Sequence, residues 1–516
     1  MSRFPSGFHG GLKMRSMLDA VATANSQAIA LRGVTGVVTY GELQASVAHA
    51  AGHLRDSSPR VIGLALDNGP AWAAIDLAAM QAKVPLVPLP FFFSAGQLAH
   101  AIKDAGIDCI HTDQPEQFEK LFAQMNIAVR ERNECRIHGQ AITEFRLEGV
   151  PAVALPPGTA KITYTSGTTG SPKGVCLGMR AMDLVAHSLQ EATDARSSDR
   201  HISLMPLSTL LENIAGLYVP LLAGATAVLL PFAEIGLRGA SGLDVQKMAA
   251  ALLACDATTT ILTPEMLRGL VAIAAAGHPL PQSLRFVAVG GAPVAERLLQ
   301  HAHALGMPVF EGYGLSECAS VVSLNTAAAN ALGTAGRPLP HVRLAFSQEG
   351  EILVAGAIML GYTGNAECNM QEGYWPTGDL GFLDAQGFLH ITGRKKNIFI
   401  TSFGRNVAPE WVERELTLSP DIAQAAVFGE GRPWNVAVIV PRGTMPEAAA
   451  RIEQAIADAN AHLPDYACIR NWLPAQAPFT PASGQMTPNG RLRRDAIHSV
   501  YQEQIDLLYE ENLNVL

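Results

Sequence analysis

Residues 164–175 combine small hydroxyl side chains, glycines and one lysine in a single run, Tyr164-Thr-Ser-Gly-Thr-Thr-Gly-Ser-Pro-Lys-Gly-Val175. Glycine lets backbone amides turn toward an anion, hydroxyl groups donate further hydrogen bonds, and a lysine adds a positive charge. The run differs from the common P-loop because proline precedes the lysine and glycine follows it. The residues that could hold a polyphosphate are Thr165, Ser166, Gly167, Thr168, Thr169, Gly170 and Lys173.

A run rich in glycine, serine and threonine is also typical of a surface linker. Here the apolar residues 160–164 before it read as a strand, and an apolar segment follows it. This setting favours a nucleotide-binding loop over a linker.

Four further segments carry residues that suit a nucleotide site. Val289-Gly-Gly-Ala-Pro-Val294 follows an apolar strand, and its small residues let a flat ring approach the backbone. Glu311-Gly-Tyr-Gly-Leu-Ser-Glu317 combines an aromatic ring with two carboxylates, and residues 374–379 present Asp379 at a turn. Residues 393–410 begin Gly-Arg-Lys-Lys-Asn-Ile. Each segment alone fits ordinary loop chemistry, but their combination in this order is not plausible by chance.

The elements that must position these motifs alternate between strand and helix patterns over the first 390 residues. Examples are the strands expected at 61–66 and 286–290 and the helices expected at 71–82, 95–105 and 245–254. Repeated βα units predict parallel-rich sheets covered by helices on both faces.

The pattern changes twice toward the C-terminus. From Gly336 strand and turn signals dominate, which predicts a β-rich subdomain that ends near residue 394. Mixed helix and strand patterns follow. We therefore predict an α/β protein with a large N-terminal domain, residues 1–395, and a small mobile α+β C-terminal domain, residues 396–516.

The composition narrows the classes of function. The 516 residues include 37 basic and 46 acidic side chains, and a net charge of −9 argues against a general nucleic-acid binder. Seven scattered cysteines without a CxxC pair fit a reducing cytoplasm and offer no metal site. The first residues lack an apolar export signal.

One segment resembles a membrane span. Residues 214–233 form an uncharged stretch that is long enough for a transmembrane helix. However, Pro220, Pro231 and two glycines divide it into a short helix, a turn and a strand. We expect buried core here and no transmembrane segment, which leaves peripheral membrane contact open.

Taken together, the motifs resemble those of the adenylate-forming, AMP-binding superfamily, which includes acyl-CoA synthetases, adenylation domains of peptide synthetases and luciferases. The resemblance extends from Val38-Thr-Tyr-Gly-Glu-Leu43 to Met486-Thr-Pro-Asn-Gly490. It implies that a carboxylate attacks the α-phosphate of ATP, that pyrophosphate leaves, and that a thiol then displaces AMP from the acyl-adenylate. The first step joins two anions, so catalysis must come from positioning and neutralisation of charge.

The resemblance also implies roles for individual residues. The loop 165–173 would hold the β- and γ-phosphates, with Thr168 and Glu317 as partners of Mg²⁺. The adenine would lie beside Gly291, Ala292 and Tyr313, and Asp379 would accept the ribose hydroxyls with help from Arg394. Gly314 and Ser316 would also belong to the nucleotide site. Lys396 would be the hinge of the C-terminal domain, and Gly404 would face the thiolation site.

The chain departs from the family pattern at the lysine that promotes adenylation. The family has Thr-x-x-Gly-Lys near the C-terminus, whereas this chain reads Thr487-Pro-Asn-Gly-Arg491. Arginine keeps the positive charge but is a planar fork with a longer reach. We expect Arg491 to be functional, bridging the carboxylate and the α-phosphate; the alternative is a nucleotide- or acyl-binding protein with impaired catalysis.

A second departure concerns the acyl pocket. Many relatives place a histidine or an aromatic residue where Thr209 stands as gate of the pocket, and the segment 205–212 lacks the aspartate that holds an α-amino group. This favours an apolar, fatty-type acid over an amino acid. The sequence thus predicts a cytoplasmic acid–thiol ligase, closest in character to fatty acyl-CoA synthetases, that uses ATP, Mg²⁺ and coenzyme A. Transfer to an acyl carrier protein or another acceptor stays open.

Overall fold

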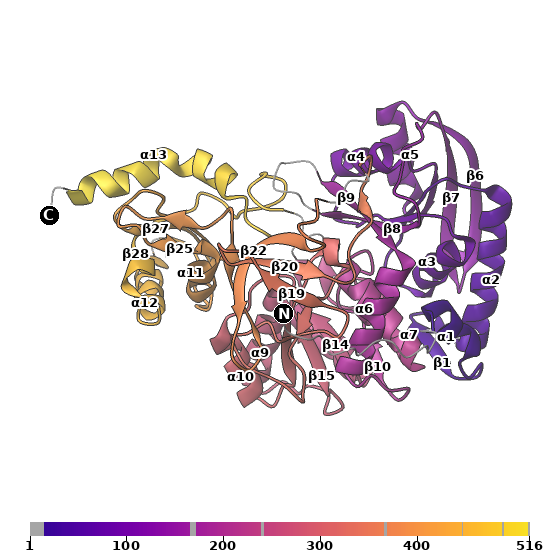
Figure 1. The fold of residues 1–516 in the computed structure, drawn as a ribbon, viewed down its shortest axis with the longest axis horizontal. Coiled ribbons are helices and arrows are strands. Elements are labelled where there is room, and N and C mark those ends of the chain that lie inside the picture. Colours follow the sequence, from indigo (N-terminus) through magenta and orange to yellow (C-terminus); the bar gives the residue numbers. More distant parts are fainter. Residues whose placement is uncertain are drawn as a thin grey trace.

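The computed structural model describes residues 15–165, 172–238, 242–365, 369–445, 447–487 and 490–513. A large N-terminal domain and a smaller C-terminal domain lie side by side (Figure 1). The chain is therefore the α/β protein with two unequal domains that its sequence predicts.

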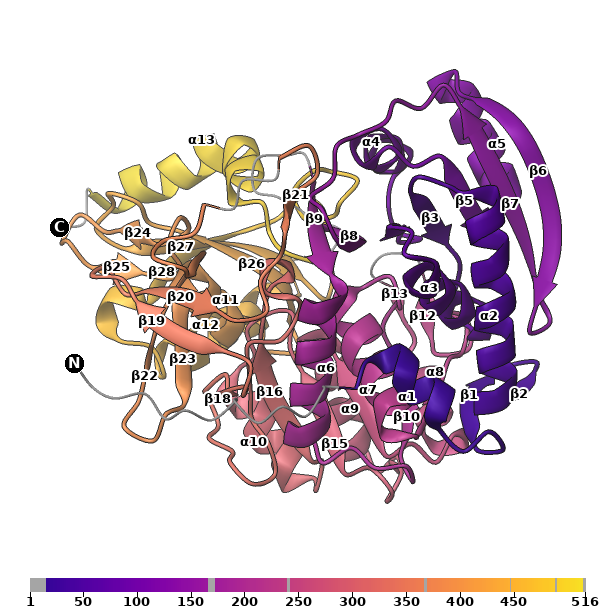
Figure 2. The ribbon, with the colours of Figure 1, turned by 45° about the vertical axis from the view of Figure 1, so that its right-hand side comes forward.

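The first of two large sheets in the N-terminal domain has eight strands in the order β21-β9-β8-β4-β3-β5-β7-β6. The central pairs among β3, β4, β5 and β8 are parallel, and the outer pairs are antiparallel. The long hairpin of β6 and β7 forms one edge (Figure 2), and its polar sequence gave no strand signal. The strands are β3 (Ile62–Ala65), β4 (Leu86–Pro88), β5 (Cys109–Thr112), β6 (Ala128–Ile137), β7 (Gln140–Glu148), β8 (Thr159–Thr165), β9 (Lys173–Gly178) and β21 (Gly361–Tyr362).

The second sheet has nine strands in the order β18-β17-β16-β15-β14-β10-β11-β1-β2. Five neighbouring pairs, from β16 to β1, are parallel, and the hairpins at both edges are antiparallel. Its strands are β1 (Ile29–Gly33), β2 (Gly36–Thr39), β10 (Arg200–Ile202), β11 (Thr226–Val228), β14 (Thr259–Leu262), β15 (Phe286–Val289), β16 (Val309–Tyr313), β17 (Ser323–Leu324) and β18 (Arg337–Pro338).

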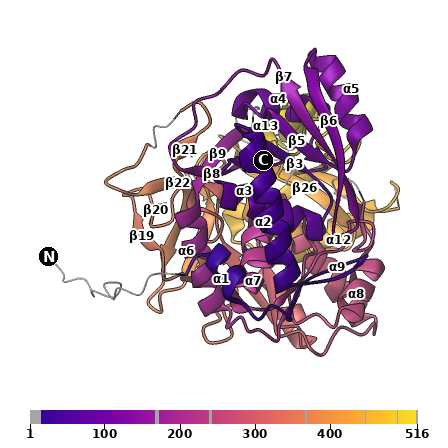
Figure 3. The same ribbon diagram turned by 90° about the vertical axis from the view of Figure 1, so that its right-hand side faces the viewer.

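Helices pack on both sheets, and their ends follow local rules. The helix α4 (Ala95–Ala105) begins with a capping box of Ser94 and Gln97 and ends at left-handed Gly106. The helices α1, α6 and α7 lie together beside the nine-stranded sheet (Figure 3). The helices are α1 (Met17–Thr23), α2 (Tyr40–Ser57), α3 (Pro70–Ala82), α4, α5 (Pro115–Met125), α6 (Met179–Ala192), α7 (Val219–Ala223), α8 (Val245–Ala254), α9 (Pro264–Ala275) and α10 (Glu296–Ala304).

The uncharged segment 214–233 is buried core, as expected. It contains most of a π-helix, η1 (Glu212–Tyr218), then α7, a left-handed Gly224 and the strand β11. The π geometry was not predicted, because it depends on packing rather than on local sequence. Among the described residues, none of the helices is long and apolar enough to cross a membrane.

The β-rich part after residue 336 contains an antiparallel sheet of four strands, β19 (Arg343–Phe346), β20 (Glu351–Ala355), β22 (Trp375–Leu383) and β23 (Leu389–Arg394). The C-terminal domain follows with the short hairpin of β24 (Phe399–Ile400) and β25 (Asn406–Val407). Its sheet consists of β26 (Ile422–Phe428), β27 (Asn435–Pro441) and β28 (Ile469–Pro474).

The sheet of the C-terminal domain is covered on both faces. Alternate residues of β27 divide between two clusters: Ala437 and Ile439 pack with α11 (Pro409–Leu416) and α12 (Ala449–Asn460). Val436 and Val438 pack with α13 (Arg494–Leu513), which crosses the other face. This period of two is what a strand buried on both sides requires.

A buried ion pair joins α3 to β8 in the N-terminal domain. The Lys161 ammonium lies 2.7 Å from a carboxylate oxygen of Asp76, and both side chains are fully buried. Lys161 also donates to Asn213 and, over 2.6 Å, to the Tyr218 hydroxyl, which donates to Asp76. Burial lowers the pKa of Lys161, and the Asp76 carboxylate opposes that shift. The network therefore fixes η1 against α3 and β8.

We expect Lys161→Met to destabilise the domain by about 3–5 kcal/mol, because it leaves the Asp76 carboxylate buried without its cation. Urea unfolding followed by circular dichroism measures the loss. The double variant Lys161→Met/Asp76→Leu should recover part of it. If the single variant were as stable as the native protein, the pair would not organise this region.

Candidate active site

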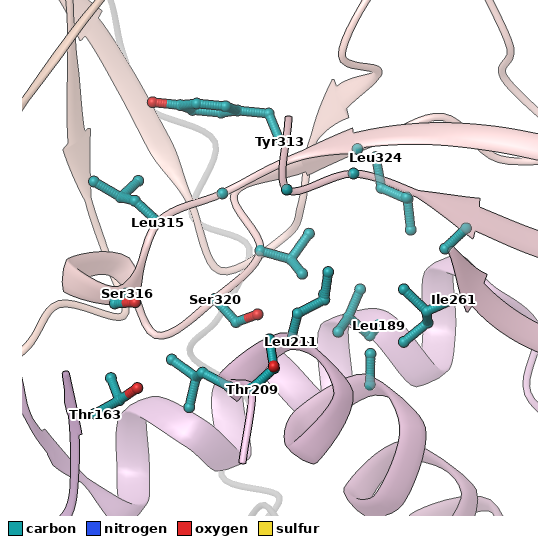
Figure 4. A pocket seen from close by; sticks show the side chains of 18 of the residues that line it. Thr163, Leu189, Thr209, Leu211, Ile261, Tyr313, Leu315, Ser316, Ser320 and Leu324 are labelled. Carbon is teal, nitrogen blue, oxygen red and sulfur yellow. The ribbon is translucent and has the colours of Figure 1, made fainter. Parts of the chain in front are cut away.

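A cavity of about 520 Å³ brings together motifs that are far apart in the sequence. It opens beyond the carboxyl ends of β14, β15 and β16, which is where open parallel sheets bind ligands. Figure 4 shows part of it, with Thr209, Tyr313 and Ser316 around the space. Of the predicted site residues, those that line it are Lys173, Thr209, Gly291, Tyr313, Gly314, Ser316, Glu317, Arg394 and Arg491.

The loop predicted to bind phosphates can be placed only at its two ends. Ser166, Gly167, Thr168, Thr169 and Gly170 lie outside the described residues. Thr165 ends β8 and is paired in register with Lys173, which begins β9. The two ends of the loop therefore lie side by side at the mouth of the cavity.

The glycine that follows the lysine has a packing role. A Cβ on Gly174 would lie 2.6 Å from the methyl carbon of Thr363, in the turn after β21. Gly314 is under a tighter constraint, since a Cβ there would lie 1.6 Å from the Ser320 carbonyl oxygen. Both glycines thus allow backbones to approach closely around the site.

Asp379 is held by two of the predicted residues. The Tyr313 hydroxyl donates to one carboxylate oxygen over 2.6 Å, and Arg394 Nε lies 2.7 Å from the other. Burial and then the Asp379 carboxylate raise the pKa of Tyr313 far above its ordinary value, so its hydroxyl stays a donor. The expectation that Asp379 lies at a turn is wrong: it lies within β22, in register with Arg394, and the left-handed residue is Gly378.

Glu317 and Lys173 meet at a residue that the sequence reasoning missed. The Tyr362 hydroxyl donates to a Glu317 carboxylate oxygen over 3.2 Å, and the Lys173 ammonium lies 5.3 Å from the centre of the Tyr362 ring. Tyr362 belongs to β21, which pairs with β9. Its position between Gly361 and Gly364 is a signal that could have suggested it.

The segment 289–294, which is expected to border the adenine, lies only partly in the cavity. Gly291 lines it and has a left-handed φ of 83°, whereas Ala292 is exposed and does not line it. Val289 and Gly290 complete this wall.

The C-terminal domain contributes Arg491 to the same cavity. Desolvation, followed by the positive charge of Arg394, lowers the pKa of Arg491 from its ordinary value, while Asp379 and Glu317 oppose that shift. Lys396 is exposed in the turn after β23, and its pKa is lowered by desolvation and by Arg394. The mouth of the cavity therefore gathers cations from both domains, which suits a polyphosphate.

Gly404 lies elsewhere. It has a left-handed φ of 70° in the turn between β24 and β25, and it does not line the cavity. In this arrangement the structure thus brings Arg491, and not Gly404, to the site.

Comparisons with known proteins identify the family of this chain. The profile of the AMP-binding enzyme family matches residues 18–375, and that of the AMP-binding enzyme C-terminal domain matches residues 396–513. The long-chain-fatty-acid–CoA ligase FadD15 of Mycobacterium bovis is 26% identical over 561 residues, covering 90% of this chain and 92% of that protein.

Solved structures share the fold. The anthranilate CoA ligase AuaEII in complex with anthranoyl-AMP superposes with a TM-score of 0.78 at 18% identity, covering 94% of this chain and 97% of that chain. The o-succinylbenzoate coenzyme A synthetase of Bacillus subtilis in complex with ATP and magnesium ion gives 0.73 at 24%, covering 93% and 98%. Because the family profile spans residues 18–375, more than half of the chain, the protein belongs to the AMP-binding enzymes, as an AMP-forming acid–thiol ligase.

Proposed function

We propose that the enzyme activates an apolar, fatty-type carboxylic acid with ATP and transfers it to coenzyme A. In the first step the carboxylate attacks the α-phosphate, the bond to the β-phosphate breaks, and pyrophosphate leaves. In the second step the thiol attacks the acyl carbon and AMP leaves. The observation that carries this proposal is one cavity in which Lys173, Glu317, Arg394 and Arg491 lie beside an apolar wall.

The described residues divide this work between the two ends of ATP. Asp379, fixed by Tyr313 and Arg394, accepts the ribose hydroxyls. Gly291, Gly314 and Ser316 border the adenine, and Lys173 holds the β- and γ-phosphates together with residues 165–170. Bound Mg²⁺ would neutralise phosphate charge, and Glu317 offers it a carboxylate oxygen, as Thr168 would offer a hydroxyl.

Arg491 takes the place of the family lysine in this proposal. Its guanidinium can donate to the attacking carboxylate and to an α-phosphate oxygen at once, which offsets the repulsion between the two anions. Arg491 lines the cavity, so its guanidinium is placed where these two anions would meet.

The second step needs a different arrangement of the C-terminal domain. We propose that residues 396–516 rotate about Lys396, so that Arg491 leaves the cavity and Gly404 enters it. Cysteines such as Cys109 and Cys255 are thiols and not parts of disulfides, which supports a cytoplasmic enzyme.

The test of the function is a panel of acids. We expect pyrophosphate release with ATP, Mg²⁺ and fatty acids, formation of a thioester when coenzyme A is added, and loss of both with EDTA. Anthranilate and 2-succinylbenzoate, acids named for relatives, should be poorer substrates. Release without a thioester would favour a carrier protein or another acceptor. An enzyme that binds ATP but releases no pyrophosphate with any acid would instead be the impaired binding protein.

Arg491→Ala should lower acid-dependent ATP–pyrophosphate exchange by at least about 100-fold, because it removes a charge that stabilises the first transition state. Arg491→Lys should retain more exchange than alanine does. Thioester formation from a supplied acyl-adenylate should stay close to that of the native enzyme. The matched control is Arg493→Ala, two residues along, which does not line the cavity. Unchanged exchange in Arg491→Ala would contradict the role.

Glu317→Gln should raise the Mg²⁺ concentration for half-maximal pyrophosphate release by about 10–100-fold, because a metal ligand loses its charge. Tyr362→Phe, which removes the hydroxyl that donates to Glu317 but keeps the carboxylate, should shift it less. A Mg²⁺ titration of both variants at saturating ATP measures the difference. Equal Mg²⁺ requirements in Glu317→Gln and the native enzyme would exclude Glu317 as a ligand.

A further inference from the structure

The cavity continues past the nucleotide end into the body of the N-terminal domain. The strand β14 contributes Thr259 and Ile261 to its wall, and β15 contributes Phe286 and Ala288. Thr259 pairs with Phe286, and Ile261 pairs with Ala288, so these alternate residues face the same side of the sheet. The cavity therefore follows one face of the sheet from the carboxyl ends of its strands to their amino ends.

The opposite wall is apolar and comes from α6, η1 and α7. It consists of side chains such as Leu189, Leu211, Ala215 and Val219. Leu211 and Ala215 are only half-buried although they pack against the core clusters, which is the mark of a cavity between them and the sheet. Figure 4 shows Leu189, Leu211, Ile261 and Leu324 around this space, which we call the acyl arm.

The depth of the acyl arm follows from strand geometry. From Gly290, beside the nucleotide end, to Arg285, at the other end, the chain spans five residues of extended backbone. At about 3.3 Å per residue this is roughly 16 Å. An extended hydrocarbon chain of about twelve carbons, which spans about 14 Å, fits within that length, since 1.5 Å bonds in a zigzag advance about 1.25 Å per carbon.

An ion pair closes the far end. Arg285 Nε donates to an Asp199 carboxylate oxygen over 2.8 Å, and a terminal nitrogen of Arg285 pairs with the other oxygen. Arg285 also donates to the carbonyl oxygens of Thr193 and Asp194, over 2.8 and 2.9 Å, just after α6. These contacts hold the guanidinium across the amino ends of the strands.

His201 also lines this end of the cavity, and both of its ring nitrogens have partners. His201 lies 3.0 Å from a buried Glu212 carboxylate oxygen and 3.0 Å from the Thr259 hydroxyl. Burial alone would raise the pKa of Asp199, but the bonds from Arg285 and the backbone of Arg196 lower it below its ordinary value, so the pair stays charged. A polar substrate terminus would have to compete with these partners, whereas a methyl terminus would not.

We propose that Arg285 and Asp199 close the acyl arm and set the longest substrate, an unbranched apolar carboxylic acid of about twelve carbons. This inference rests on the proposed function and deepens it. An acid with a single aromatic ring would reach Ile261 and Ala288 and would leave the lower half of the arm unfilled, without the contacts that a chain makes there.

The test compares hexanoate, dodecanoate and hexadecanoate in the native enzyme and three variants. The native enzyme should prefer dodecanoate to hexadecanoate by at least about tenfold in kcat/KM. Arg285→Ala opens the end and should raise the hexadecanoate-to-dodecanoate ratio by at least about tenfold. Ala288→Phe obstructs the middle of the arm and should lower the dodecanoate-to-hexanoate ratio by a similar factor.

The matched control is Arg200→Ala. Arg200 lies at the same end of the sheet and pairs with Asp256, but it does not line the cavity. Its chain-length profile should match that of the native enzyme. Circular dichroism and the Tm of each variant establish that it is folded.

Binding of the same acids, measured as a rise in Tm without ATP, separates the two proposals. If no acid supports pyrophosphate release but the Tm shifts follow the predicted lengths in each variant, the proposed function fails and the acyl arm stands. If the native enzyme activates acids but Arg285→Ala and Ala288→Phe keep its chain-length profile, the arm is wrong and the function stands. A preference for anthranilate over dodecanoate would also overturn the chain-length proposal.

Discussion

The ion pair of Lys161 and Asp76 is the interaction on which the geometry of the site depends. It lies where α3, β8 and η1 meet, and Asn213 and Tyr218 complete it. Removing a charge from water costs several kcal/mol, so such a pair persists only when its partners are tightly fixed. That requirement sets the position of β8, which carries the phosphate loop at its end. It also sets the position of η1, which forms a wall of the acyl arm.

Sequence reasoning reached the nucleotide end of the site because its parts are local motifs. Glycines, hydroxyls and charges at fixed spacing predicted Gly291, Tyr313, Glu317 and Arg394, and these residues share one cavity. It could not find Tyr362 as readily, because its partners Lys173 and Glu317 are contributed by distant segments. Asp379 was expected at a turn because Pro-Thr-Gly-Asp resembles one, yet pairing with β23 draws it into a strand.

The parts of the fold that could be predicted were also those with a signal in the local sequence. The helix patterns at 95–105 and 245–254 gave α4 and α8 with the bounds that the structure has. The hairpin of β6 and β7 was missed because β6 is exposed along most of its length, so it lacks the alternation that marks a half-buried strand. The π-helix η1 was missed because its geometry is selected by packing around buried Glu212 and His201. Neither the pairing of β6 nor the packing that selects the π geometry can be read from the local sequence.

The two ends of the cavity carry arginines, and this raises the question of which end receives the carboxylate. Each end presents the same type of cationic side chain, so charge alone does not distinguish them. Their partners do. The donors of Arg285 are taken by Asp199 and two backbone carbonyl groups, which leaves a closed and neutralised end. Arg491 lies instead near Arg394, and the repulsion from that second cation outweighs the attraction of either Asp379 or Glu317, which lowers the cost of bringing in an anion. In the proposed complex, an acid with an apolar chain would therefore be oriented before any bond forms, with its carboxylate toward ATP and its methyl end toward Arg285.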